Sequence, residues 1–156
     1  MFAAYKQLAL GFSSNADITR MGHVSHGFDA KRVMGYPESH DKDRVMYEAF
    51  TYGNIGGTNP PNNNLNNALS RMSAIGATSL LVPGPKMIWQ FGELGYDEEL
   101  NNDRLGIKPT RWEYLDDTYR KQLHDVYTSL IHLKTDNEFF NTSNSLGGVF
   151  ERVVFS

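Results

Sequence analysis

The sequence has no cysteine, no long apolar run and no concentration of basic residues. The absence of cysteine excludes disulfides and thiolate metal sites, although it leaves the cellular compartment open. No segment reaches the roughly 18 apolar residues that a membrane-spanning helix needs, so we expect no membrane span. Lysine and arginine are scattered along a chain of net charge −3. We therefore do not expect nucleic acid as a partner.

The first residues also lack the features of a secretory signal. The start, MFAAYKQLALGF, is mildly apolar and has neither a basic n-region nor a cleavage site. We expect no signal peptide in this chain, and the localisation stays open, with a periplasmic or extracellular parent protein as one alternative. The chain has 156 residues, of which 40% are hydrophobic. That is enough for one globular domain with a core.

Apolar residues recur at helical spacing in four segments: 3–12, 43–51, 65–81 and 119–134. The third carries small residues on one face, which favours close packing. Aspartates are placed to cap two of the helices. We expect Asp41 or Asp43 to cap the second helix, and Asp116 or Asp117 to cap the fourth. The apolar face of the fourth is predicted to comprise Tyr119, Leu123, Val126, Leu130 and Leu133.

Two short segments indicate buried β-strands, RVMGY at 32–36 and KMIWQF at 86–91. Pro37 ends the first, because proline cannot donate to a ladder. A helix follows each segment, which predicts parallel pairing with crossover helices. Two strands do not make a stable parallel sheet. We therefore expect an α/β chain that is part of a larger structure.

Polar side chains follow both predicted strands, in PESHDKDR and in GELGYD. In α/β folds, ligands bind at the carboxyl ends of the strands. The candidates at these ends are Glu38, His40, Asp41, Asp43, Arg44, Glu93, Tyr96 and Asp97. The loop over 92–112 is long for a compact domain, which favours a function for it. Trp89 and Phe91 fit the core better than a stacking platform.

Other interpretations of the histidines stay open. His40 and Asp41 also fit a surface histidine beside a helix cap. An adjacent His-Asp pair binds metal in all-helical phosphohydrolases, but that requires the pair to lie inside a helix, and Pro37 disfavours it. His23 and His26 have a spacing that holds metal on a helix. Their glycine neighbours favour a loop, and a third ligand is missing nearby.

Three segments in order carry a family resemblance. YPESHDKDR resembles the histidine-aspartate motif after the seventh barrel strand of the alpha-amylase family, glycoside hydrolase family thirteen. PGPKMIWQFGELGYD is similar to the eighth strand and its loop, particularly in amylase-like enzymes of gut bacteroides. KPTRWEYLDD resembles the segment that leads into the eighth helix. The resemblance covers about residues 33–140.

The resemblance implies the C-terminal portion of a (β/α)8 TIM barrel, roughly its last two βα units. Residues 1–147 would form a partial catalytic barrel, and residues 148–156 would begin a C-terminal β domain. The implied activity is retaining hydrolysis of α-1,4-linked glucans such as starch, glycogen and maltooligosaccharides. Such hydrolysis uses two carboxyl groups, a nucleophile and an acid/base. Neither has a matching motif here, so we expect this chain alone to be inactive.

By matching position, the resemblance implies that Asp41 is the carboxylate that stabilises the transition state. It places His40 on the same sugar, and Arg44 and Tyr96 are expected to contribute to substrate binding. Two alternatives stay open: part of an α-glucan branching enzyme or transglycosylase, and a non-catalytic carbohydrate-binding or interaction module that uses His40, Trp89 and Tyr96. We expect no cofactor or metal in this chain, although the parent enzyme is a candidate for calcium. We also expect self-association through exposed barrel edges.

Overall fold

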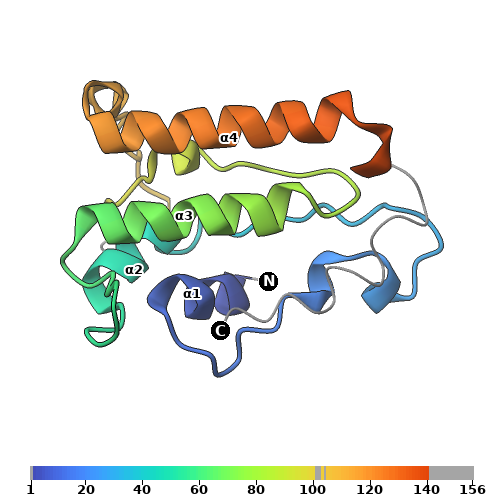
Figure 1. Ribbon diagram of the computed structural model, residues 1–156, viewed down its shortest axis with the longest axis horizontal. Coiled ribbons are helices and arrows are strands. Elements are labelled where there is room, and N and C mark those ends of the chain that lie inside the picture. Colours follow the sequence, from blue (N-terminus) through green and yellow to red (C-terminus); the bar gives the residue numbers. More distant parts are fainter. Residues whose placement is uncertain (1, 101–102, 104, 141–156) are drawn as a thin grey trace.

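Four α-helices form the described part of the chain. The computed structural model describes residues 2–100, 103 and 105–140. The helices are α1 (Phe2–Leu10), α2 (Val45–Tyr52), α3 (Leu65–Leu80) and α4 (Thr118–Asp136). α3 and α4 lie side by side and run in the same direction, while α1 and α2 pack against each other and against α3 (Figure 1). The four helical segments predicted from the sequence are confirmed.

Short 3-10 turns lie between the α-helices and after α4. They are Thr19–Met21, Val24–His26, Gly92–Leu94, Trp112–Asp116 and Glu138–Phe140. The turn Gly92–Leu94 and the residues after it belong to the long loop predicted over 92–112. This loop passes close to the start of α4, and Asp97 and Arg120 join the two through an ion pair of 2.7 Å. The loop is therefore fastened to α4 at this point rather than free along its length.

Side-chain caps explain where α3 and α4 begin. The Oδ1 atom of Asn64 accepts a hydrogen bond of 3.0 Å from the backbone N–H of Asn67. Asp117 Oδ1 accepts from the N–H groups of Tyr119 and Arg120, at 2.9 and 3.0 Å. Both satisfy donors that the first helical turn leaves without partners. Of the two predicted caps for α4, the structure selects Asp117.

The main core lies between the helices and includes Tyr5, Ala9, Met21, Met46, Leu69, Met72, Ile75, Leu123 and Tyr127. α3 approaches α4 closely at Gly76, where a Cβ atom would lie 2.8 Å from Cε2 of Tyr127. The small-residue face predicted for α3 therefore sits at this helix contact. The face predicted for α4 is only partly buried. Leu123 is buried, whereas Tyr119, Val126 and Leu133 are exposed.

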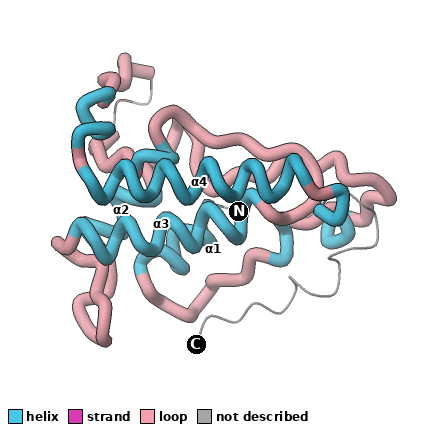
Figure 2. The backbone as a smooth tube through the Cα atoms, turned by 45° about the horizontal axis from the view of Figure 1, so that its top comes forward, coloured by secondary structure: helices cyan, strands magenta, loops and turns pink. Residues whose placement is uncertain are grey.

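The two predicted β-strands do not form, and the prediction of an α/β fold is wrong. The described chain consists of helices and loops without a named strand (Figure 2). The segments 32–36 and 86–91 do run alongside each other, joined by one isolated parallel bridge between Gly35 and Lys86. Two hydrogen bonds make it, from Gly35 N to Pro85 O at 3.1 Å and from Met87 N to Gly35 O at 3.2 Å.

The two strands do not form because neighbouring strands and backbone N–H donors are too few. Pro85 and Pro37 flank the bridge and have no N–H group, so the ladder cannot extend through them. Met34 is 52% exposed, and it is not the core residue that a buried strand requires. An isolated pair of short strands is marginal without further strands. The described residues therefore form a small helical fold and not the last βα units of a TIM barrel.

Two further expectations depended on the barrel. The predicted start of a C-terminal β domain, residues 148–156, lies outside the described residues. Exposed barrel edges do not exist in the part of the chain that the structure describes, because no strand forms there. Large apolar side chains are nevertheless exposed on α4, among them Ile131 and Leu133. Self-association stays a prediction.

Candidate functional site

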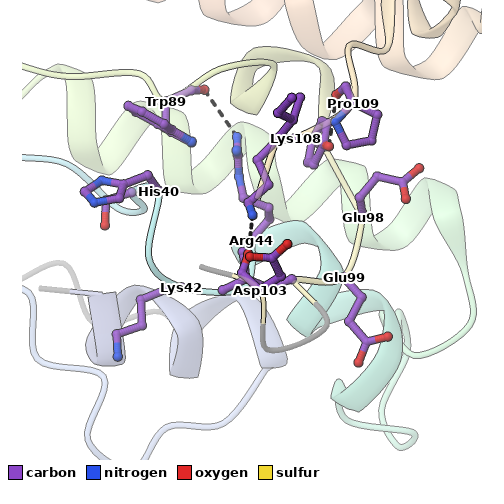
Figure 3. A pocket seen from close by; sticks show the side chains of 13 residues that line it. His40, Lys42, Arg44, Trp89, Glu98, Glu99, Asp103, Lys108 and Pro109 are labelled. Atoms are coloured by element: carbon purple, nitrogen blue, oxygen red, sulfur yellow. Dashed lines mark hydrogen bonds between the residues drawn. The ribbon is translucent and has the colours of Figure 1, made fainter. Parts of the chain in front are cut away.

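A cavity of about 220 Å³ lies between the turn before α2 and the long loop before α4. The turn contributes four residues: Ser39, His40, Lys42 and Arg44. The other walls come from Trp89 and from the loop residues between Tyr96 and Pro109. Figure 3 shows His40 and Trp89 on one side and Glu98, Lys108 and Pro109 on the other. Three of the four predicted site residues, His40, Arg44 and Tyr96, thus meet here.

Arg44 joins the two walls of the cavity. Its Nη2 atom pairs with Oε1 of Glu38 at 2.9 Å, and only 6% and 8% of the two side chains are exposed. The same Nη2 donates to the carbonyl oxygens of Trp89, at 3.3 Å, and of Gln90. The guanidinium also lies over the ring of Tyr96, 4.8 Å from its centroid. Arg44 Nε is buried and has no hydrogen-bond partner among the described residues.

Glu38 takes the role that the sequence assigned to an aspartate. Its Oε2 atom accepts a hydrogen bond of 2.9 Å from the N–H of Val45, the first residue of α2. The prediction that Asp41 or Asp43 caps this helix is therefore wrong. Asp43 reaches the other way, and its Oδ1 accepts from the N–H of Leu100 at 2.7 Å. That bond ties the turn to the long loop and closes the cavity at this end.

Asp41 lies in the turn beside the cavity, but its side chain is not part of the cavity lining. Its Oδ1 accepts a hydrogen bond of 2.9 Å from the hydroxyl of Ser39. This bond lowers the pKa of the Asp41 carboxyl, partial burial opposes the shift, and His40 and Lys42 add to it. The group is therefore a carboxylate at neutral pH, and it serves as an acceptor and a negative charge rather than as an acid.

The aromatic residues of the site differ in exposure. His40 is exposed, and its ring lies 5.6 Å from that of Trp89 at an angle of 51°. Tyr96 is buried, stacks beside Phe91 and donates its hydroxyl to the carbonyl of Pro109 at 3.0 Å. Burial raises the pKa of Tyr96, with Glu98 as a smaller cause. His40 and Trp89 thus form the accessible aromatic surface, while Tyr96 is held inside the wall.

A second network anchors the loop wall to α4. Arg120 Nη2 pairs with Oδ2 of Asp97 at 2.7 Å and Nη1 donates to the carbonyl of Leu94 at 3.1 Å. The hydroxyl of Tyr114 donates to the other oxygen of Asp97 at 2.5 Å, and Arg120 lies 3.8 Å from the ring centroid of Tyr114. Burial, followed by Asp97, raises the pKa of Tyr114. Asp97 is therefore a structural anchor and not a free acidic group.

The sequence interpretation favoured the core for Trp89 and gave it a sugar contact only in the alternative of a non-catalytic module. The structure places Trp89 half-buried in the cavity wall. Its position at the carboxyl end of the segment 86–91, across from the motif YPESHDKDR, was the available signal. Periodicity alone did not separate a core tryptophan from one at a cavity, since both occupy apolar runs.

The described histidines do not form a metal-binding site with other ligand side chains. No group of three or more histidine, aspartate or glutamate side chains is placed to hold a metal ion within the described residues. His26 instead interacts with Arg20, through the carbonyl oxygen at 2.8 Å and a guanidinium nitrogen at 3.3 Å. His40 and Asp41 lie in a turn rather than inside a helix, which disfavours the helical phosphohydrolase interpretation. No described helix is long and apolar enough to cross a membrane.

Comparison of the chain with protein-family models and with curated proteins finds no match. The site is therefore defined by its own geometry: a small cavity with aromatic, basic and acidic side chains on opposite walls.

Proposed function

We propose that this chain binds an α-linked glucan in the cavity, as part of an alpha-amylase-type glycosidase. The observation that carries the proposal is the meeting of His40, Arg44 and Tyr96 with Trp89 around one space. Small-molecule sites combine an apolar or aromatic surface with a few convergent polar groups. Trp89 and His40 offer the flat surface that the apolar face of a sugar ring requires, and the loop offers the polar groups.

The charges of the lining favour a neutral polyol over an ion. Lys42 and Lys108 supply donors, whereas Glu98 and Asp103 supply acceptors. Each sugar hydroxyl both donates and accepts a hydrogen bond, so it finds partners on both walls. A strongly charged ligand of either sign would face one set of like charges.

The size of the cavity favours one sugar ring. Its volume of about 220 Å³ is below the roughly 300–1,000 Å³ typical of sites for larger ligands. We therefore place one ring inside, with the rest of the glucan extending past His40 and Trp89 into solvent. Buried Arg44 supports the walls from below, through its bonds to Glu38 and to the backbone at Trp89 and Gln90.

For the whole enzyme we propose the chemistry that the sequence resemblance implies, which is retaining cleavage of α-1,4 bonds. The ionised carboxylate of Asp41 lies beside the cavity rather than in its lining, and it fits a group that favours positive charge on a sugar ring next to the one inside. Retention also needs a nucleophile and an acid/base about 5 Å apart, which we assign to other parts of the enzyme. We expect no release of reducing sugar from starch by this chain alone.

The test is a titration with maltoheptaose, followed by calorimetry and by tryptophan fluorescence. We expect saturable binding that Trp89→Ala weakens about fivefold or more, since stacking of a flat ring, such as a nucleic-acid base, on an aromatic side chain contributes about 1–3 kcal/mol. The chain offers a matched control in Trp112, its other tryptophan, which is 66% exposed and outside the cavity. Trp112→Ala is expected to bind as the unmodified chain does. Absence of binding at millimolar glucan, or equal losses in both variants, would contradict the proposal.

A further inference from the structure

Three lysines that are distant in the sequence, Lys31, Lys86 and Lys134, lie near the backbone bridge between Gly35 and Lys86. Lys86 follows the loop after α3, Lys134 lies in the last turn of α4, and Lys31 precedes the bridge. Lys134 Nζ donates to the carbonyl of Val82 at 2.8 Å, and Lys86 Nζ donates to that of Pro83 at 3.2 Å. Two ammonium groups thus hold neighbouring carbonyls.

Lys31 is the third lysine of the cluster, and it comes from the segment that precedes Gly35. Its backbone carbonyl lies 3.2 Å from the point where a Cβ atom of Gly84 would be, so the two segments touch there. Its Nζ atom is buried and has no hydrogen-bond partner among the described residues. A buried donor without an acceptor is costly, and it is rare unless a ligand or water completes it.

The electrostatics agree with this placement. Burial lowers the pKa of Lys86 to about 8, and Lys134 adds to the shift. Burial and then Lys31 lower the pKa of Lys134, and burial lowers that of Lys31. No carboxylate enters these shifts, and none of the three lysines forms an ion pair in the described part of the chain. Among the described residues, therefore, no carboxylate is paired with the positive charge of these lysines.

We propose that Lys31, Lys86 and Lys134 form a binding site for a phosphate group, separate from the glucan cavity. A phosphate near neutral pH carries close to two negative charges and three acceptor oxygens. It can therefore give one oxygen to each ammonium, whereas a single carboxylate has one charge and two oxygens. The lysines are half-buried between three segments rather than spread over an open face. This arrangement fits a small ligand better than a macromolecular surface.

The first test measures thermal unfolding of the full chain at about pH 7.5 in phosphate and in sodium chloride of equal ionic strength. A ligand that binds the folded state raises the melting temperature by mass action, and screening acts equally in both salts. Phosphate also stabilises folded proteins in general by exclusion from their surface, so the calorimetric titration decides between that effect and a site. We expect a higher melting temperature in phosphate and one site by calorimetric titration. Equal melting temperatures in the two salts, with no binding heat, would overturn the proposal.

The second test removes single lysines. Lys31→Met and Lys134→Met keep most of the length of the side chain and remove its charge, and we expect each to weaken phosphate binding at least tenfold. Lys121→Met is the matched control, because Lys121 pairs with Asp125 on the exposed surface of α4. The proposal would be overturned if Lys121→Met alone weakened phosphate binding, or if Lys31→Met and Lys134→Met both bound phosphate as the unmodified chain does. Circular dichroism establishes that each variant is folded, and two variants guard against one that is not.

Two arms identify the source of the phosphate group. Inorganic phosphate and glucose 6-phosphate are compared, with glucose as the neutral reference. Tighter binding of the ester identifies a sugar phosphate as the ligand, equal binding identifies free phosphate, and binding of glucose at this site would contradict both. Between about pH 7.5 and 9.5 phosphate stays a dianion. Affinity should therefore fall over this range as Lys86 loses its proton, since Lys86 lies near Lys134, which in turn lies near Lys31.

Discussion

Glu38 and Arg44 form an ion pair of 2.9 Å with less than a tenth of either side chain exposed. The pair occupies the point where the extended segment before α2 meets the loop after Trp89. Glu38 also accepts from the first N–H of α2, and Arg44 also donates to two carbonyls of the opposite wall. One ion pair therefore starts a helix and fixes the floor of the proposed glucan site.

The first prediction concerns this pair. Glu38→Ala leaves the guanidinium of Arg44 buried without its counter-charge, and breaking a buried pair from one side costs about 3–5 kcal/mol. We expect a loss of that order in the free energy of unfolding, measured in urea, together with weaker glucan binding. Glu113→Ala is the control, because its side chain is 59% exposed and its pair with Arg111 is longer, at 3.3 Å. We expect that change to stay below about 1 kcal/mol. Similar losses in both variants would contradict the prediction.

A second prediction follows from the contact between Gly76 and Tyr127. Replacing a helix glycine by alanine usually stabilises by about 1 kcal/mol. Here the new Cβ would meet a buried ring at 2.8 Å, and overpacking costs about 1–3 kcal/mol. We therefore expect Gly76→Ala to lower the free energy of unfolding. Tyr127→Leu in the same chain should make the alanine less harmful, as a double-mutant cycle would measure. A gain in stability from Gly76→Ala alone would show that the helices are farther apart.

The third prediction concerns pH. Lys86 has a pKa of about 8 in the folded chain, against about 10.4 in an unfolded one. Between these values the unfolded state binds one more proton, so the free energy of unfolding rises with pH. The destabilisation is fully present below about pH 8 and disappears above the unfolded pKa. Lys134 is the charged group that contributes to the lowered pKa of Lys86, and the pKa of Lys134 is itself lowered by burial and by Lys31.

The measurement is urea unfolding at several pH values from about 7.5 to 9.5, where we expect a positive slope of up to roughly 1.4 kcal/mol per pH unit. Lys86→Met should flatten most of the slope and raise stability at pH 7.5. Above this range the buried tyrosines Tyr5 and Tyr127, whose pKa values burial raises, reverse the trend. The unfolded tyrosines lose their protons first there. A flat profile for the unmodified chain would refute the lowered pKa of Lys86.

A fourth prediction separates support of the site from contact with glucan. Arg120 does not line the cavity, but it holds Asp97 and the carbonyl of Leu94 in the loop that does. Arg120→Met should destabilise the chain, because Asp97 loses its buried partner, and should weaken maltoheptaose binding through a loosened loop. Asp125→Asn, on the exposed face of the same helix, is the control. Full glucan affinity in a folded Arg120→Met chain would show that the loop needs no such anchor.

Much of the helical structure was predictable because helix signals are local. Spacing of apolar residues located all four helices, and the side chain of Asp117 fixed the start of α4. The strands were not predictable in the same way. Short apolar runs such as KMIWQF suit a strand only when a neighbour supplies a ladder. Pro85 and Pro37 limit that ladder to a single bridge, and the barrel interpretation fails with it.

The candidate site was also predictable only in part from the sequence. Sequence order alone placed polar residues after 32–36 and 86–91, and it named His40, Arg44 and Tyr96. It did not show that Glu38 rather than Asp41 or Asp43 caps α2, because all three lie within the reach of one helical turn. Trp89 was assigned to the core for a related reason, since exposure of a tryptophan depends on what packs over it. The cluster of Lys31, Lys86 and Lys134 was also not predictable from the sequence, because the three residues are far apart from one another along the chain.

The sequence by itself determined the helices, the caps of α4 and the residue types available for binding, because these depend on neighbours within a few positions. Only the tertiary structure decided which side chains share a space. It brought the turn at Arg44 against the loop at Tyr96, and it left the buried Nζ atom of Lys31 without a hydrogen-bond partner among the described residues. Contacts between distant segments depend on how every part of the chain packs at once, and no local pattern of residues encodes that result.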